Sequence, residues 1–421
     1  MGLTYQSTRG GETGVSASMA ILQGLAKDGG LFMPDHIPVL DCSLEELSHK
    51  TYQEVAYAVM KQFLTDFTEE ELKTCIERAY DSKFDTEEIA PLVKADGAYY
   101  LELFHGSTIA FKDMALQLLP HLLTLSAKKN GETREIFILV ATSGDTGKAA
   151  LDGYHDIPGV EIAVFYPTGG TSEIQRLQMA TQEGANVAVY AVRGNFDDAQ
   201  TGVKKVFGDK AIAAKLAERN IRLSSANSIN WGRLVPQIVY YFAAYAQLLK
   251  AGKIAFGDKV DFCVPTGNFG DILAGYLAKK LGLPVGRLIC ASNANNVLTD
   301  FLTTGVYDRR RPLLKTTSPS MDILVSSNLE RLLYLLSGDT ALVAGLMKDL
   351  SEQGFYRVPD ALLGAIQAEF AAGYCDDAQA EAVIGRVYRE RGYLMDPHTA
   401  CGWAAAETHR GDAPTVVLST A

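Results

Sequence analysis

The stretch IFILVATSGDTG at residues 136–147 passes from a short apolar run directly into a turn rich in glycine and hydroxyl side chains. An apolar run of this length, bounded by turn residues, predicts a strand buried on both faces. Comparable runs occur at residues 160–166, 187–192, 260–264 and 287–291, and helical spacing occurs near residues 145–155, 171–183, 197–218, 232–250 and 270–282. This alternation predicts an α/β fold with helices on both faces of parallel sheets, whose ligands bind beyond the carboxyl ends of the strands.

The two ends of the chain have a different pattern. Residues 1–95 show mainly helical spacing, for example at Met19, Leu22 and Leu25, and we expect them to form an N-terminal, mainly helical domain. Residues 340–408 return to a mostly helical pattern, and residues 416–418 are expected to form a last short strand.

Composition places the chain among folded globular proteins. Hydrophobic residues make up 47% of the 421 residues and charged residues 21%, which excludes a largely disordered or coiled-coil chain. The 39 Lys and Arg residues are outnumbered by 50 Asp and Glu residues, which gives a formal net charge of -11. This charge disfavours nucleic acid and membrane surfaces as partners.

The cysteines and the opening segment favour a cytoplasmic location. The six cysteines lie at least 26 residues apart, which excludes a paired CxxC motif, so we expect free thiols and no bound metal. The opening residues are polar and contain no apolar signal segment, and no apolar run approaches the roughly 18 residues that span a membrane. We therefore expect the chain to stay in the cytoplasm.

Two loops that follow predicted strands have the composition of anion-binding turns. In residues 141–147, glycines let backbone N–H groups approach an anion, and the next helix directs its positive end there. Residues 265–271 contain Gly267 and Gly270, but Leu273 replaces the third glycine of a dinucleotide fingerprint, which favours a monophosphate over a nucleotide. Each loop alone is also compatible with a structural turn.

A candidate reactive lysine lies in the segment FHGSTIAFKD at residues 104–113. A helix is expected to begin near Asp113, which places Lys112 at the positive end of a helix dipole and among apolar neighbours. Both effects lower the pKa of a lysine and favour Schiff-base formation. The alternative is a lysine that reaches solvent. One reactive lysine and two anion-binding loops together suit pyridoxal phosphate, with its aldehyde on Lys112, its phosphate at residues 267–271 and a substrate carboxylate at residues 142–147.

Seven segments, in order along nearly the whole chain, carry a resemblance to a known family. They are residues 5–10 (YQSTRG), 24–32 (GLAKDGGLF), 104–113 (FHGSTIAFKD), 143–147 (SGDTG), 227–233 (NSINWGR), 265–271 (PTGNFGD) and 396–400 (DPHTA). On these segments the sequence resembles threonine synthase, a family of fold-type II pyridoxal-phosphate enzymes. Related dehydratases share single loops of this set, whereas the opening segment and residues 227–233 are typical of threonine synthase.

The resemblance implies a tryptophan synthase beta-like architecture, with two open, twisted, mostly parallel sheets flanked by helices and a helical N-terminal domain. We expect residues 96–421 to form the catalytic region, made of two α/β lobes, with the smaller lobe at approximately residues 125–225. Family members usually continue beyond the position of Ala421, so the resemblance also implies a further C-terminal segment.

The resemblance also implies roles for individual residues. Cofactor contacts are implied for Lys112, which carries the Schiff base, for Phe111 and Asp145, for the phosphate-binding residues Gly267, Asn268, Phe269, Gly270 and Asp271, and for Thr399 at the pyridine nitrogen. Substrate contacts are implied for Ser143, Thr146, Asn227, Ser228 and Arg233. Many relatives carry Asn where this chain has Asp145. His398, beside Asp396, is expected to have a positional role rather than to act as a base.

The implied reaction converts O-phospho-L-homoserine and water into L-threonine and phosphate, with Lys112 as a base. One alternative is a related lyase of the same fold, such as a serine or threonine dehydratase. Another is a catalytically silent, threonine-synthase-like protein. Arg233, with Asn227 and Ser228, separates the first alternative from the main prediction, because a dehydratase needs no second phosphate site. The intact Lys112 and Thr399 argue against the second.

Overall fold

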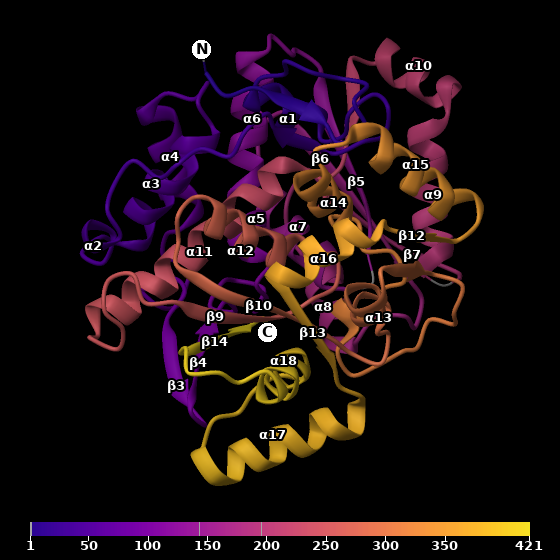
Figure 1. Ribbon diagram of the computed structural model, residues 1–421. Helices are drawn as coiled ribbons and strands as arrows, with labels where there is room; N and C mark the ends of the chain where they lie inside the picture. Colours follow the sequence, from indigo (N-terminus) through magenta and orange to yellow (C-terminus); the bar gives the residue numbers. More distant parts are fainter. Residues whose placement is uncertain (1, 143, 195) are drawn as a thin grey trace.

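Figure 1 shows the fold as a computed structural model, which describes residues 2–142, 144–194 and 196–421. The strands of the larger sheet are β3 (Leu92–Ala95), β4 (Ala98–Glu102), β9 (Val260–Pro265), β10 (Val285–Ser292), β13 (Phe370–Tyr374) and β14 (Thr415–Ser419). Their order is β13-β10-β9-β14-β4-β3, and each neighbouring pair is parallel except the antiparallel pair of β3 and β4. β9 and β14 are buried along their whole length, as expected for apolar runs in the middle of a sheet.

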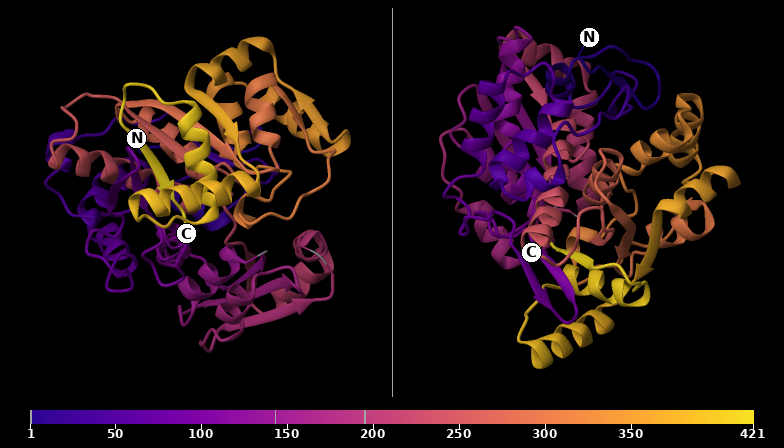
Figure 2. Two further views of the ribbon diagram at one scale, coloured as in Figure 1. Left: turned by 90° about the horizontal axis from the view of Figure 1, so that it is seen from below. Right: turned by 60° about the vertical axis from the view of Figure 1, so that its left-hand side comes forward.

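The smaller sheet is wholly parallel and follows the order β7-β6-β5-β8. Its elements are β5 (Glu135–Ala141), α7 (Asp145–Tyr154), β6 (Val160–Pro167), α8 (Glu173–Ala180), β7 (Val187–Val192), α9 (Phe196–Gly208), α10 (Lys210–Glu218) and β8 (Ile221–Ser224). Two helices replace the single helix predicted over residues 197–218, because the Asp209 side chain caps a new helix by accepting from two backbone N–H groups. Figure 2 shows this magenta lobe standing apart at the lower right of its left-hand view.

The N-terminal segment is mainly helical, but it also contains a strand pair. Its elements are β1 (Tyr5–Ser7), α1 (Ala17–Gln23), β2 (Phe32–Pro34), α2 (Leu44–Leu47), α3 (Tyr52–Phe63) and α4 (Glu69–Ala79). β1 and β2 pair antiparallel, and capping boxes at Thr51 and Thr68 fix the starts of α3 and α4. The Trp231 ring contacts the rings of Tyr5 and Phe63 at centroid distances of 5.4 and 5.5 Å. The segment therefore packs on the helix that Trp231 begins.

The remaining elements lie outside these two sheets. They are α5 (Asp113–Leu116), α6 (Leu119–Lys129), α11 (Trp231–Lys250), α12 (Gly270–Lys280), α13 (Val297–Thr304), β11 (Val306–Asp308), the 3-10 helix η1 (Pro319–Met321), α14 (Leu329–Ser337), α15 (Thr340–Glu352), β12 (Phe355–Arg357), α16 (Asp360–Glu369), α17 (Asp377–Arg391) and α18 (Pro397–Thr408). Residues 340–408 are mostly helical, as predicted, but they also contain the short strands β12 and β13, and β13 joins the edge of the larger sheet beside β10. The structure confirms the α/β fold with two mostly parallel sheets.

Several sequence predictions concern the whole chain. All six cysteines lie in the described part of the chain and have free thiols. Among the described residues, no helix combines the length and apolar character needed to cross a membrane. The domain boundary near residue 95 remains a prediction, and the hairpin of β3 and β4 lies on both sides of it.

Candidate active site

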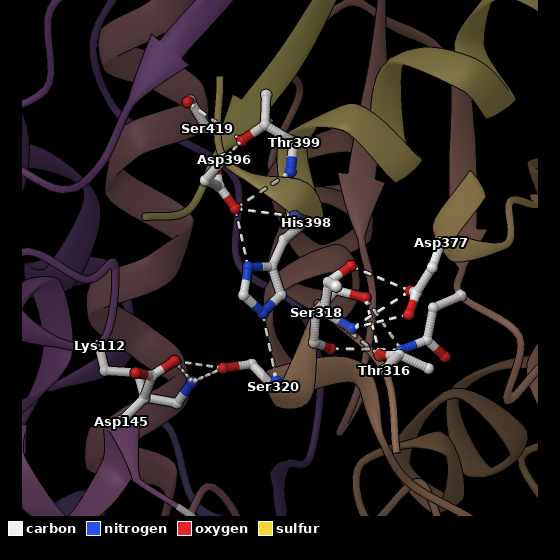
Figure 3. Close-up of polar contacts among 12 residues, drawn as sticks. Lys112, Asp145, Thr316, Ser318, Ser320, Asp377, Asp396, His398, Thr399 and Ser419 are labelled. Atoms are coloured by element: carbon white, nitrogen blue, oxygen red, sulfur yellow. Dashed lines mark hydrogen bonds and ion pairs between the residues drawn. The ribbon is translucent and has the colours of Figure 1, made fainter. Parts of the chain in front are cut away.

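Lys112 lies immediately before α5, and only 11% of its side chain is exposed. Its Nζ atom donates to the Ser320 hydroxyl at 3.2 Å and lies 3.7 Å from Asp145 Oδ2 (Figure 3). Burial lowers the pKa of Lys112, and the Asp145 carboxylate partly opposes this shift. The expected contribution of a helix dipole is small, because α5 has only four residues. Burial therefore favours the neutral amine that a nucleophilic or basic lysine requires.

Asp145 is the first residue of α7. Its carboxylate accepts hydrogen bonds from two side chains and lies near two lysines. Gln175 Nε2 donates to Oδ1 at 2.6 Å, and the Ser320 hydroxyl donates to Oδ2. Lys148 Nζ lies 3.5 Å from Oδ1. Burial by itself raises the pKa of Asp145, but Lys112 and Lys148 hold that pKa well below its usual range. Asp145 therefore remains an anion beside Lys112.

A chain of polar contacts joins this pair to α18, as Figure 3 shows. The Ser320 backbone N–H donates to His398 Nε2 at 3.2 Å, and His398 Nδ1 lies 2.7 Å from Asp396 Oδ1. Because Nε2 accepts a hydrogen bond, the ring proton of a neutral His398 lies on Nδ1 and faces Asp396. The Thr399 hydroxyl donates to the other carboxylate oxygen of Asp396 and lies 3.1 Å from Ser419 Oγ. Both ring nitrogens of His398 thus have partners within the protein, in keeping with a positional role.

The loop between β9 and α12 has the shape of a phosphate cradle. Phe269 has a left-handed backbone with φ of 64°, which turns the chain into the 11-residue helix α12. A Cβ atom at Gly267 would lie 2.4 Å from the Ser320 backbone oxygen, so only glycine fits there. Backbone N–H groups at the start of α12 are suited to a phosphate. The residues at 267–271 therefore fit the phosphate of the implied cofactor.

Asp271 is the one acid in this loop, and its carboxyl group is buried in the first turn of α12. Burial raises the pKa of Asp271 to about 7, although its Oδ1 atom accepts from the Ile272 N–H at 2.8 Å. A carboxyl group that is largely neutral below this pH opposes a nearby phosphate less than an ordinary aspartate does.

Residues 227–233 place a buried guanidinium beside the same region. Arg233 is 4% exposed, and its Nη1 atom donates to the Ala226 carbonyl at 2.7 Å. Its Nε atom is buried and has no hydrogen-bond partner among the described residues. Burial lowers the pKa of Arg233 to about 10. A buried cation with a free donor is costly unless an anion satisfies it, so this position is suited to an anionic ligand.

The other predicted site residues differ in exposure, and one of them falls outside the described part of the chain. The Phe111 ring centroid lies 4.7 Å from Lys112 Nζ, and Thr146 is half-buried in the first turn of α7. Asn227 is exposed, and the Ser228 hydroxyl is half-buried. Ser143 lies outside the described residues. The structure thus brings Lys112 and Asp145 into direct contact, while the roles assigned to all these residues remain predictions.

Two residues at the centre of the site, Ser320 and Asp396, were given no role of their own from the sequence. Ser320 contacts both Lys112 and Asp145, and Asp396 holds both His398 and Thr399. Asp396 precedes a helix, so its sequence signal is that of a cap. Ser320 lies in the short helix η1, far from the other site segments in sequence, and no local pattern identifies it.

Comparison with family models divides the chain in two. The model described as threonine synthase N terminus matches residues 4–80. The model described as pyridoxal-phosphate dependent enzyme matches residues 85–420, which is more than half of the chain.

Individual relatives give the same result. Threonine synthase-like 1 of Homo sapiens is 42% identical over 96% of this chain and 56% of its own, and the Pongo abelii protein matches over 59% of its own. This chain therefore spans less than two thirds of the length of those relatives. Threonine synthase of Saccharomyces cerevisiae is 39% identical over 96% of this chain and 82% of its own. The crystal structure of threonine synthase from Brucella melitensis with bound pyridoxal phosphate has a TM-score of 0.92 and 42% identity, and the match covers 100% of this chain and 88% of that one.

Proposed function

Because this chain belongs to the threonine synthase family of pyridoxal-phosphate-dependent enzymes, we propose that it converts O-phospho-L-homoserine and water into L-threonine and phosphate. The observation that carries the proposal is the buried Lys112 amine, held between the Asp145 carboxylate and the Ser320 hydroxyl. The cofactor is pyridoxal phosphate. The free cysteines support a cytoplasmic location, which is part of the same proposal.

The residues present fit this cofactor. Lys112 would bond its aldehyde carbon, and the loop at residues 267–271 would hold its phosphate with backbone N–H groups. Thr399 would take the pyridine nitrogen, Asp145 the ring oxygen, and Phe111 would line the site. When bound, the cofactor supplies a conjugated ring that accepts electron density from the alpha carbon of the substrate.

The chain's own groups move protons and bind the substrate. The Lys112 amine, whose pKa burial lowers, accepts a proton from the alpha carbon and takes part in the later transfers at the beta and gamma carbons. The net reaction breaks the bond between the gamma carbon and the phosphate oxygen and one C–H bond at the beta carbon. A proton is added at the gamma carbon, the hydroxyl of water is added at the beta carbon, and the remaining proton leaves with the phosphate.

Substrate recognition requires sites for two anionic groups. Arg233, with Asn227 and Ser228, binds the substrate phosphate, because a guanidinium can donate two hydrogen bonds to one phosphate. Thr146, in the first turn of α7, binds the substrate carboxylate, and we assign the same role to Ser143. A dehydratase would accept free hydroxy amino acids and would not need the buried Arg233 guanidinium.

The deciding experiment incubates the holoenzyme with O-phospho-L-homoserine and measures phosphate and L-threonine together. Equal amounts of both products are expected from the wild type, and neither is expected from Lys112→Ala. Borohydride reduction should place the cofactor on Lys112 in the wild type. Normal turnover by Lys112→Ala would remove this lysine from the scheme.

The same assay separates the alternatives. Ammonia release from L-serine or L-threonine, without turnover of the phosphorylated substrate, would support a dehydratase instead. A protein that binds the cofactor but converts none of these compounds would be catalytically silent. That alternative is relevant because threonine synthase-like 1 proteins are among the relatives at 42% identity.

A further inference from the structure

Two consecutive residues that precede α14 contact both proposed phosphate-binding segments. Ser327 Oγ lies 3.4 Å from Ser228 Oγ and 3.3 Å from Asn268 Oδ1. Asn328 Nδ2 lies 3.3 Å from the Ser228 carbonyl and 3.1 Å from the Asn268 carbonyl. Ser228 belongs to the proposed site for the substrate phosphate, and Asn268 belongs to the proposed site for the cofactor phosphate. Ser327 and Asn328 therefore form a bridge between the two sites.

The Asn328 side chain makes its hydrogen bonds within this bridge and not to the backbone of α14. Asn328 occupies the position before α14 where an asparagine commonly caps the helix, yet its side chain makes no capping hydrogen bond. Its backbone N–H also donates to the Asn268 carbonyl, at 3.0 Å. Asn328 is fully buried, so its amide group depends on these protein partners.

Arg331 fixes the orientation of the Asn328 amide. Arg331 Nη1 donates to Asn328 Oδ1, so the amide oxygen faces Arg331 and the Nδ2 group must face the two loops. The guanidinium is fully buried, and its other nitrogens donate to the Ile229 carbonyl at 2.7 Å and the Phe32 carbonyl at 3.2 Å. Arg331 therefore ties the bridge to residues 227–233 and to the N-terminal segment.

We propose that Ser327 and Asn328 are positioning residues that couple the two phosphate sites, so that a phosphate bound at Ser228 and Arg233 strengthens the hold of residues 267–271 on the cofactor phosphate. This inference rests on the proposed function, which supplies both ligands. A phosphate that orders Ser228 also orders Ser327 and Asn328, and these residues restrain the Asn268 loop. Coupling between binding sites is reciprocal, so the bound cofactor also strengthens substrate binding.

The experiment measures how fast the holoenzyme releases its cofactor, with and without a ligand in the substrate-phosphate site. The probe is 5-phosphonopentanoate, which has a carboxylate and a phosphonate but no amine. It cannot form an imine with the cofactor, so its effect is non-covalent, and the Ser327 and Asn328 variants distinguish coupling through the bridge from direct contact between the probe and the cofactor. Calorimetry on the holoenzyme gives the saturating probe concentration. Release is then followed during dialysis as the loss of protein-bound visible absorbance.

In the wild type, saturating probe is expected to slow cofactor release at least about fivefold, the lower end of ordinary coupling between sites. In Ser327→Ala and in Asn328→Asp, the rate of cofactor release without the probe is expected to exceed the rate with the probe by less than about twofold. Asn328→Asp keeps an acceptor for Arg331 but removes the amide donor to both loops. Ser327→Ala removes a single hydroxyl, so it tests the bridge even where the Asn328 variant folds poorly.

The matched control is Asn186→Ala in the smaller lobe. Asn186 Nδ2 also donates to two backbone carbonyls, at 2.8 Å from Tyr154 and 2.8 Å from Val160, but it contacts neither phosphate segment. This variant is expected to keep the wild-type ratio. The coupling alone would be overturned by either of two results. One is a wild-type ratio of release rates in Ser327→Ala with bound probe, and the other is a probe that binds the wild type without slowing cofactor release. A probe that does not bind the wild-type holoenzyme would overturn the substrate-phosphate site as well.

Discussion

Lys112 and Asp145 form a buried charge pair, in which Nζ of the lysine lies 3.7 Å from Oδ2 of the aspartate. Lys148 Nζ lies 3.5 Å from the other carboxylate oxygen. One carboxylate therefore faces the Nζ atoms of two lysines, of which only Lys112 is in the position expected for the cofactor. The charge of Asp145 limits how far burial can lower the pKa of Lys112.

Replacing Asp145 with asparagine is expected to lower the pKa of Lys112 further. Loss of the neighbouring negative charge destabilises the ammonium form, and the effect of such a charge is about one pH unit or more. Covalent attachment of pyridoxal phosphate to the cofactor-free protein needs the neutral amine. The midpoint of its rate against pH should therefore move to lower pH in Asp145→Asn. Asp360→Asn, whose side chain is 88% exposed, is the control, and an unchanged or higher midpoint for Asp145→Asn would contradict the expectation.

Gly267→Ala is expected to weaken cofactor binding. Its Cβ atom would lie 2.4 Å from the Ser320 backbone oxygen, and a backbone atom cannot move away as a flexible side chain can. Overpacking of this kind costs about 1–3 kcal/mol, which corresponds to roughly 5- to 150-fold weaker binding in equilibrium dialysis. Gly345→Ala is the control, because a Cβ atom there meets open space. Equal cofactor affinity in the two variants would count against the cradle.

The raised pKa of Asp271 predicts how the stability of the cofactor-free protein depends on pH. Burial raises its pKa from 3.8 to about 7, so the folded state favours the neutral acid. The stabilisation from this neutral acid is complete below pH 3.8 and is lost as the pH rises through about 7. The loss is about 1.4 kcal/mol per pH unit within this window. Asp271→Asn should therefore raise the denaturation temperature more at pH 8 than at pH 5, measured by calorimetry. An equal change at both pH values would show that Asp271 is not the titrating group.

Thr399→Asp is expected to change which products form. A neutral hydroxyl opposite the pyridine nitrogen leaves that nitrogen unprotonated, whereas a carboxylate there favours the protonated ring and makes it a stronger electron sink. The variant should therefore release more keto acid by transamination relative to L-threonine, measured by chromatography. Ser419→Ala is the control, because Ser419 Oγ lies 3.1 Å from the Thr399 hydroxyl but is not expected to contact the cofactor. An unchanged product ratio would argue against this role for Thr399.

Strands with continuous apolar runs could be predicted from the sequence, and strands without them could not. β5, β6, β7, β9, β10 and β14 all coincide with predicted runs. β8 was missed because its four residues, Ile221–Ser224, contain no continuous apolar run, and the first three are only half-buried. β13 was missed because residues 370–374 are mostly small and have low strand propensity, so its pairing with β10 decides its conformation.

The site could be predicted where its chemistry lies in local motifs. Lys112, Asp145 and the loop at residues 267–271 each stand in a recognisable segment. Ser320 and Asn328 do not, because their contacts join segments far apart in the sequence. The Asn328 amide reaches the carbonyl of Ser228, 100 residues earlier, and no local pattern reports such a contact.

The position of β14 has a consequence for how the chain folds as it is synthesised. This strand, made from residues 415–419, lies between β9 and β4 in the interior of the larger sheet. The strand order of the larger sheet is complete only after the ribosome has released residues 415–419. The strands β5 to β8 of the smaller sheet, in contrast, come from one continuous stretch of chain. The smaller lobe is therefore able to fold during translation. The edges of β9 and β4 that pair with β14 stay unpaired until β14 is made, and unpaired strand edges favour aggregation and chaperone binding.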